Sequence, residues 1–151
     1  MKNLFRLFII TYLITFCFSF AQTIKENWVP VSMEKDRAMY INVAGLSSFM
    51  GDEIFVWSLQ EMNSPMTMEE VNGDIYKVRT YYHINKEINR YSILQIIFYD
   101  EKDNVLKNYS YERNSEIPEF KYNSPIIKNT EVAKILTKCL EFIDSAVEKR
   151  K

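Results

Sequence analysis

Reactive side chains are scarce in this sequence, which has one histidine and two cysteines among its 151 residues. No serine or cysteine stands in a nucleophile-elbow motif, and a single histidine cannot complete a catalytic triad. We therefore expect His83 to be a surface or half-buried strand residue rather than a catalytic base. The scarcity of these groups favours a protein that is not an enzyme.

Ligand sets for metals or cofactors are missing as well. Glu69, Glu70 and Asp74 lie close together in the sequence but lack the spacing of a calcium-binding loop. The acidic run Asp100–Asn104 is explained by hairpin-turn chemistry, because Asp and Asn tolerate the backbone conformations of a tight turn. We expect no catalytic residue, no metal site and no cofactor.

The first 21 residues are typical of a secretory signal peptide. Lys2 and Arg6 form a basic start, and Leu7–Phe18 is apolar but too short to cross a bilayer comfortably. Ser19-Phe20-Ala21 then offers the small residues that a signal peptidase reads. We expect export to the periplasm, the outer surface or the medium, with residues 22–151 forming one domain that has no transmembrane span.

An excess of positive charge is also lacking, since 19 basic residues stand against 20 acidic ones. Removal of Lys2 and Arg6 with the signal peptide leaves 17 basic and 20 acidic residues, a net charge of −3. A chain with this charge is not suited to binding nucleic acid.

Cysteine is almost absent from the expected mature chain. A lipoprotein signal with Cys17 as the lipidated residue is the alternative to simple cleavage, but it needs a small residue before the cysteine, and Phe16 is large. Cleavage after Ala21 leaves only Cys139, which cannot form an internal disulfide. The stability of the domain must therefore come from packing.

Glycine and proline number only three and four, and neither interrupts the runs of Val, Ile, Tyr and Phe between Ile75 and Arg113. Six strands are predicted, at Trp28–Ser32, Arg37–Val43, Glu53–Met62, Ile75–Ile84, Arg90–Asp100 and Val105–Arg113. Asn63–Asp74, with Pro65 and Gly73, is predicted as a loop, and Ser115–Lys128 as a long irregular connection.

The fifth predicted strand is apolar at both alternating positions. Strict alternation places Ile93, Ile97 and Tyr99 on one face and Leu94, Ile96 and Phe98 on the other. A strand of this kind belongs in the middle of a sheet with something packed on each side.

A helix is predicted from Asn129 or Thr130 to about Glu148. Its apolar stripe follows helical spacing and consists of Val132, Ile135, Leu136, Cys139, Leu140, Ile143 and Val147. The stripe must bury itself on one face of the sheet, which makes Cys139 a buried small hydrophobe. The predicted fold is α+β, with a meander of about six antiparallel strands and a C-terminal helix on one face.

Several short segments resemble the surface-adhesin protein E family of small exported bacterial proteins. They are Trp28 at the start of the domain, Met39-Tyr40-Ile41-Asn42-Val43 with Leu46-Ser47, Ile54-Phe55-Val56-Trp57, the tyrosine-rich middle strands and the terminal helix near Cys139. The resemblance implies an adhesin-type domain rather than an enzyme. It also implies a cysteine on a middle strand that tethers the helix, and Asn89–Ser92 contains none.

Tyrosine is abundant in the predicted meander, and its rigid apolar ring with a polar tip suits recognition surfaces. We expect an exported binding or adhesion domain that recognises a protein or surface through this sheet. The candidate interaction surface consists of Tyr91, Ile93, Ile97, Tyr99, Tyr109 and Tyr111.

Two alternatives share the same features. In the first, the second apolar face of the sheet is a homodimer contact of a structural or assembly subunit of the envelope. In the second, the domain is a periplasmic carrier that holds a small apolar ligand between sheet and helix. The expected partner is therefore another protein or a second copy of this chain. Whether a small-molecule ligand binds is unknown.

We predict that the exported protein begins at Gln22 and carries no lipid, because Ser19-Phe20-Ala21 is the better cleavage site. The intact mass of the exported chain checks this prediction. A diacylglyceryl mass on a chain that starts at Cys17 would contradict it.

Overall fold

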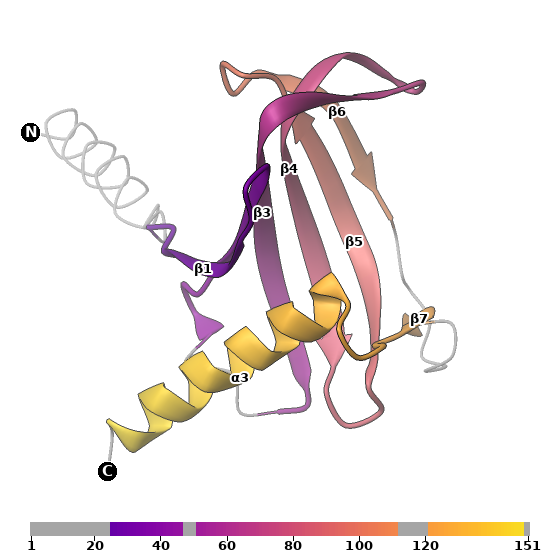
Figure 1. Ribbon diagram of the computed structural model, residues 1–151. Coiled ribbons are helices and arrows are strands. Elements are labelled where there is room, and N and C mark those ends of the chain that lie inside the picture. Colours follow the sequence, from indigo (N-terminus) through magenta and orange to yellow (C-terminus); the bar gives the residue numbers. More distant parts are fainter. Residues whose placement is uncertain (1–24, 47–50, 112–120, 150–151) are drawn as a thin grey trace, which may run out of the picture.

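The computed structural model describes residues 25–46, 51–111 and 121–149. In these residues six antiparallel strands form an open meander and one helix follows near the C-terminus (Figure 1), which confirms the predicted α+β fold. The strands are β1 (Trp28–Met33), β2 (Arg37–Asn42), β3 (Glu53–Met68), β4 (Val71–Asn85), β5 (Arg90–Tyr99) and β6 (Val105–Ser110). The predicted signal peptide and its cleavage site lie outside the described residues, as do residues 112–120.

The helix α3 (Glu131–Glu148) begins as predicted. Thr130 is its N-cap, and the Thr130 side chain accepts a hydrogen bond from the backbone N–H of Ala133 at 3.3 Å. Figure 1 shows α3 running across the lower ends of β3, β4 and β5. The stripe buries Val132, Ile135 and Cys139, but Val147 at its end is 44% exposed, so the stripe is covered over only part of its predicted length.

Alternation along the first three strands supplies the core under the helix. Met39 and Ile41 of β2 and Ile54 and Val56 of β3 are all buried on the side of α3. They pack with Ile135 and Cys139 in one hydrophobic cluster. We call this side of the sheet the helix face.

The predicted loop Asn63–Asp74 is wrong. β3 continues to Met68 and β4 starts at Val71, so a long hairpin with a turn at Glu69 and Glu70 replaces the loop. Beyond Met62, β3 has no partner from β2, so Pro65 lies where a missing N–H costs no ladder hydrogen bond to that side. The pairing of β3 with β4 shifts register on both sides of Met66, so the hairpin is irregular there.

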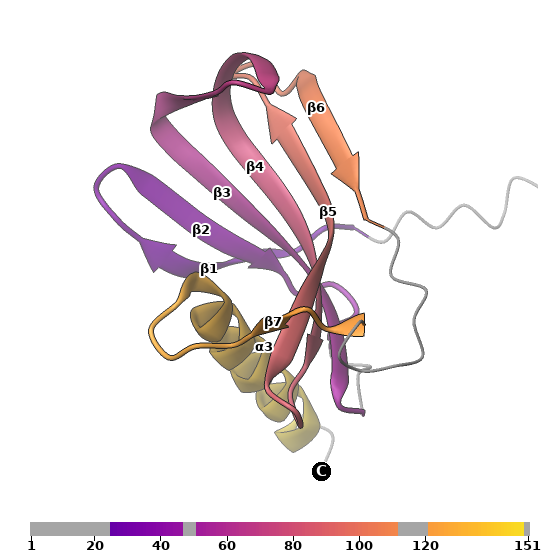
Figure 2. The same cartoon turned by 90° about the vertical axis from the view of Figure 1, so that its right-hand side faces the viewer.

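The tip of the β3–β4 hairpin closes a second small core. Val71, Ile75 and Phe98 are buried there, and Leu106 packs against them. Gly73 suits this point because its φ of +120° is a conformation that other residues rarely adopt, and a Cβ on it would also lie 3.0 Å from a methyl carbon of Leu106. Figure 2 shows the hairpin tip bending over at the top of the sheet.

The predicted division of β5 into two alternating faces is also wrong. Tyr81 pairs with Gln95 while Tyr82 pairs with Ile93, so Leu94 is an extra residue in a β-bulge. The bulge reverses the alternation beyond it. Ile93 and Ile96 therefore share the helix face, whereas Ile97 and Tyr99 lie on the opposite face.

The predicted irregular connection before the helix contains a seventh strand. β7 (Ser124–Pro125) pairs with Arg90 and Tyr91 at the lower end of β5. The upper part of β5 pairs with β6, from Gln95 to Tyr99. Two short strands thus share one edge of β5 (Figure 2).

Cys139 is a free thiol with no exposed surface, as predicted, and burial raises its pKa to about 12. We expect Cys139→Ser to lower the free energy of unfolding by about 1–3 kcal/mol, because the hydroxyl would enter an apolar site. Urea unfolding of both proteins measures the difference. Rapid labelling of the native thiol by a maleimide would contradict the packing of α3.

Candidate functional site

Seven planar side chains contact one another in a row along the sheet face opposite α3, with two of the ring contacts tilted rather than stacked. In order they are Trp28, Arg79, Trp57, Tyr81, Phe55, His83 and Tyr122, and we call them the planar stack. The five central members alternate between β4 and β3, while Trp28 comes from β1 and Tyr122 from the segment before β7.

Strand register produces the centre of the planar stack. Trp57 lies directly opposite Tyr81, and Phe55 lies opposite His83. The Trp57 and Tyr81 rings are stacked at 4.7 Å between centroids and 17° between planes, and Phe55 and His83 at 4.1 Å and 14°. Cross-strand pairs of this type stabilise a sheet beyond the burial of their area.

The upper end of the planar stack holds a guanidinium between two indoles. The Cζ atom of Arg79 lies 5.1 Å from the ring centroid of Trp28 and 5.4 Å from that of Trp57. Glu26 forms an ion pair with Arg79 and accepts a hydrogen bond from Trp28 Nε1 at 3.1 Å. The hydrogen bond from Arg79 is the main cause that lowers the pKa of Glu26. The Nε atom of Arg79 is buried and, among the described residues, has no hydrogen-bond partner.

The lower end is organised around a second carboxylate, Glu53. Lys121 Nζ lies 2.6 Å from Glu53 Oε1, the Tyr122 hydroxyl donates to the same oxygen, and His83 Nε2 lies 3.3 Å from Glu53 Oε2. These contacts, with the hydrogen bond from Lys121 the strongest, lower the pKa of Glu53 to about 2. His83 is only 4% exposed, not half-buried as predicted, and its burial lowers its pKa, so the ring is neutral at pH 7.

Three contacts hold the segment Lys121–Asn123 across β5. The Ser92 hydroxyl donates to the Lys121 carbonyl at 2.7 Å and accepts from the Asn123 N–H at 3.2 Å. Arg90 Nε donates to the Tyr122 carbonyl at 2.8 Å. The segment brings the Tyr122 ring onto His83, at 4.8 Å between ring centroids. No alternation in the sequence of this segment predicts the contact.

The six residues of the predicted interaction surface do not share one face. Tyr91 and Ile93 pack against the core under α3, and Tyr109 packs edge-on against Phe98 in the second core. Tyr111 lines a hollow of about 150 Å³ together with Ile93 and Ile96.

Only two of the six lie beside the planar stack. Ile97 pairs with Arg79 and Tyr99 with Lys77, so both point to the face opposite α3. The sequence missed Trp28, Phe55, Trp57, Arg79 and Tyr122 as members of this surface. Phe55 and Trp57 alternate onto one side of the predicted strand Glu53–Met62, and this alternation could have identified these two residues.

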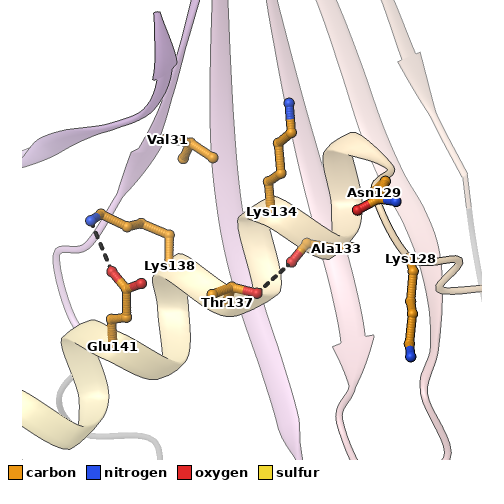
Figure 3. Close-up of a pocket in the computed structure, with 8 residues that line it drawn as sticks. All are labelled: Val31, Lys128, Asn129, Ala133, Lys134, Thr137, Lys138 and Glu141. Atoms are coloured by element: carbon orange, nitrogen blue, oxygen red, sulfur yellow. Dashed lines mark hydrogen bonds and ion pairs between the residues drawn. The ribbon is translucent and has the colours of Figure 1, made fainter.

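Two of the larger cavities near these elements bear on function. One of about 450 Å³ lies between β1 and α3 and is lined mainly by polar side chains (Figure 3). Lys128 and Lys134 point in opposite directions there, and Lys138 is paired with Glu141 at 2.9 Å. The cavity therefore offers neither a convergent anion site nor an apolar binding site.

The second cavity, of about 250 Å³, lies at the upper end of the planar stack. Trp28, Leu59 and Tyr99 supply its apolar lining. Its charged lining consists of Glu26, Glu61, Lys77, Arg79 and Asp103. Lys77 is bound to Asp103 at 2.6 Å, and Glu61 lies 3.9 Å from Lys77.

Within residues 25–46, 51–111 and 121–149, no three His, Cys, Asp or Glu side chains are arranged to hold a metal ion. In the same ranges, no helix has the length and apolar character that crossing a membrane requires.

His83 and Glu53 predict a loss of stability in acid. Both pKa values are lowered in the folded state, so the unfolded chain binds protons first as the pH falls. Stability from neutral His83 is complete above its ordinary pKa of 6.5 and declines below it, and the contribution of Glu53 declines below 4.5. Urea unfolding at a series of pH values measures this.

His83→Phe keeps a ring beside Phe55 and is the matched variant, since the chain has no other histidine. We expect the variant to lose the decline that starts near pH 6.5 and to keep the one that starts near 4.5. Equal slopes for the two proteins just below pH 6.5 would show that His83 is not buried in its neutral form.

Comparison of the chain with protein-family models, with curated proteins and with solved structures gave no match. The similarity to the surface-adhesin protein E family therefore stays a prediction from the short segments that suggested it.

Proposed function

We propose that this protein is an exported, non-enzymatic binding domain that recognises a protein partner through the sheet face opposite α3. We call this surface the stack face. It is formed by the outward side chains of β3, β4 and β5 around the planar stack, including Phe55, Trp57, Leu59, Tyr81, Ile97 and Tyr99.

The observation that carries the proposal is that these six large side chains are only partly buried on a face that α3 does not cover. Burial of a large apolar side chain contributes roughly 1.5–3 kcal/mol. Large apolar side chains that lie together and stay partly exposed are a feature of interaction sites.

The composition of the stack face also favours a protein partner. Trp, Tyr and Arg are the residues that most often dominate the energy of protein interfaces; Trp57 and Tyr81 lie at its centre, and Arg79 stacks on Trp57 toward the upper end. Both rings of the Trp57–Tyr81 pair already stack inside the molecule, so they present their edges outward. A flat protein surface suits such edges better than a sugar or base that needs a free ring face.

The carrier alternative gains no support from the larger cavity between β1 and α3. Only Val31 and Ala133 among its lining residues are apolar, which does not suit an apolar ligand. A smaller cavity of about 220 Å³ is lined by three apolar side chains (Val29, Val43 and Phe142) and three polar ones (Lys138, Glu141 and Ser145). The core under α3 is filled by Val132, Ile135 and Cys139 packed against the sheet.

Site-specific photo-cross-linking in cells that export the protein tests the proposal. A photoreactive phenylalanine analogue at position 97 lies on the stack face, and the same analogue at position 127 is a matched control, because Ile127 is 61% exposed and lies before α3. We expect protein adducts from position 97 and none from position 127. Adducts from neither position, or equally from both, would contradict the proposed role of the stack face.

A further inference from the structure

We propose that the partner of the stack face is a second copy of this chain, bound face to face about a two-fold axis near the Trp57–Tyr81 pair. The inference rests on the proposed function, since it names the partner of the same surface. It follows from how charges and apolar groups are distributed along the planar stack.

Within the part of the chain that the structure describes, the two ends of the stack face carry opposite net charge. The upper end holds three carboxylates and two cations, from Glu26, Glu61, Asp103, Lys77 and Arg79. Among the described residues, the lower end holds one carboxylate and two cations, from Glu53, Lys121 and Arg90, beside the Lys86–Asp52 ion pair, which adds no net charge. A face that is negative at one end and positive at the other is complementary to itself when a copy is turned end for end.

Strand positions place the axis at the centre of the planar stack. Glu61 follows Trp57 by four residues in β3, and Glu53 precedes it by four. At about 3.3 Å per residue, each lies roughly 13 Å from Trp57 in opposite directions. A two-fold axis at Trp57 and Tyr81 therefore sets Glu53, with its partner Lys121, over Glu61 of the other copy.

The upper cavity gives Lys121 of the second copy a place to bind. Its lining includes the rings of Trp28 and Tyr99 and the carboxylates of Glu26, Glu61 and Asp103, which outnumber the cations Lys77 and Arg79. An ammonium group that enters it gains both cation–π and carboxylate contacts. Lys121 is 30% exposed while it contacts Glu53, so its side chain can share these contacts without leaving its own segment.

The centre of the contact is apolar. Phe55, Trp57 and Leu59 of one copy would face the same side chains of the other, with Ile97 and Tyr99 beside them. Two sheets packed face to face lie about 10 Å apart and interdigitate side chains of this size. The charges at the ends then fix the register, and the apolar centre supplies most of the affinity.

Charge reversal with mixing tests the arrangement. Glu61→Lys and Lys121→Glu each place two like-charged pairs across the symmetric contact, so each variant alone should dimerise at least tenfold more weakly than the native chain. Mixed together they form one heterodimer in which both pairs are opposite in charge again. Sedimentation velocity over a range of concentrations and salt measures the native chain, each variant and the mixture.

We expect a native dimer that weakens as salt rises, and a mixture that recovers most of the native affinity. A folding defect in either variant would not be rescued by mixing. Lys134→Glu on α3 is the control, because Lys134 is exposed on the helix away from the stack face, and this variant should dimerise like the native chain. If circular dichroism shows that Lys121→Glu has lost its fold beside Glu53, the same change in a Glu53→Gln chain replaces it.

A monomer at all concentrations, or a mixture no tighter than the separate variants, overturns the two-fold arrangement. Cross-links from position 97 to other proteins only would then leave the proposed function standing. Cross-links from position 97 to nothing would remove both.

Discussion

Unbroken pairing of β3 with β4 from Glu53 to Glu61 is the constraint on which both faces of this protein depend. Nine consecutive residue pairs keep the same alternation, so every even position of β3 in this stretch belongs to the helix face and every odd position to the stack face. Ile54 and Val56 are compact aliphatic residues that fit under α3. Phe55 and Trp57 are planar residues that stack on rings of β4. The alternation of β3 thus places its compact side chains on the helix face and its planar side chains on the stack face.

Two carboxylates attach distant parts of the chain to the paired strands β3 and β4. Glu26 joins the start of β1 to Arg79, and Glu53 joins Lys121 and Tyr122 to the lower end of β3. The Glu26 and Glu53 side chains are 47% and 40% exposed, so salt and acid reach both contacts. The planar stack is therefore rigid at its centre, where rings pack on rings, and sensitive to solution conditions at its ends.

The sequence predicted those elements in which one alternation dominates. β2 has a clear apolar side and α3 has a regular apolar stripe, so their existence and buried faces follow from spacing. β5 is apolar at both alternations, and a bulge in such a strand leaves no trace, because a shift of one residue replaces one apolar side chain with another. For this reason the residues of β5 in the predicted interaction surface lie on two different faces of the sheet.

The other errors have equally specific causes. Pro65 and Gly73 are typical of loops. Here Pro65 lies in the part of β3 that has no β2 neighbour, and Gly73 lies in β4 where Leu106 comes close. Tyr122 belongs to a segment with no periodic pattern, and its place on His83 depends on hydrogen bonds to Ser92 and Arg90 that are distant in sequence. Contacts of this kind depend on tertiary structure and have no local signature.

The planar stack also has a consequence for how its face can bind. A side chain whose ring is held on both sides loses little rotamer freedom when a partner covers its edge, so most of the ordering cost is met during folding. Trp57 lies between Arg79 and Tyr81 and is held in this way. The arrangement favours a partner with an equally rigid surface, and a second copy of the same stack has that property.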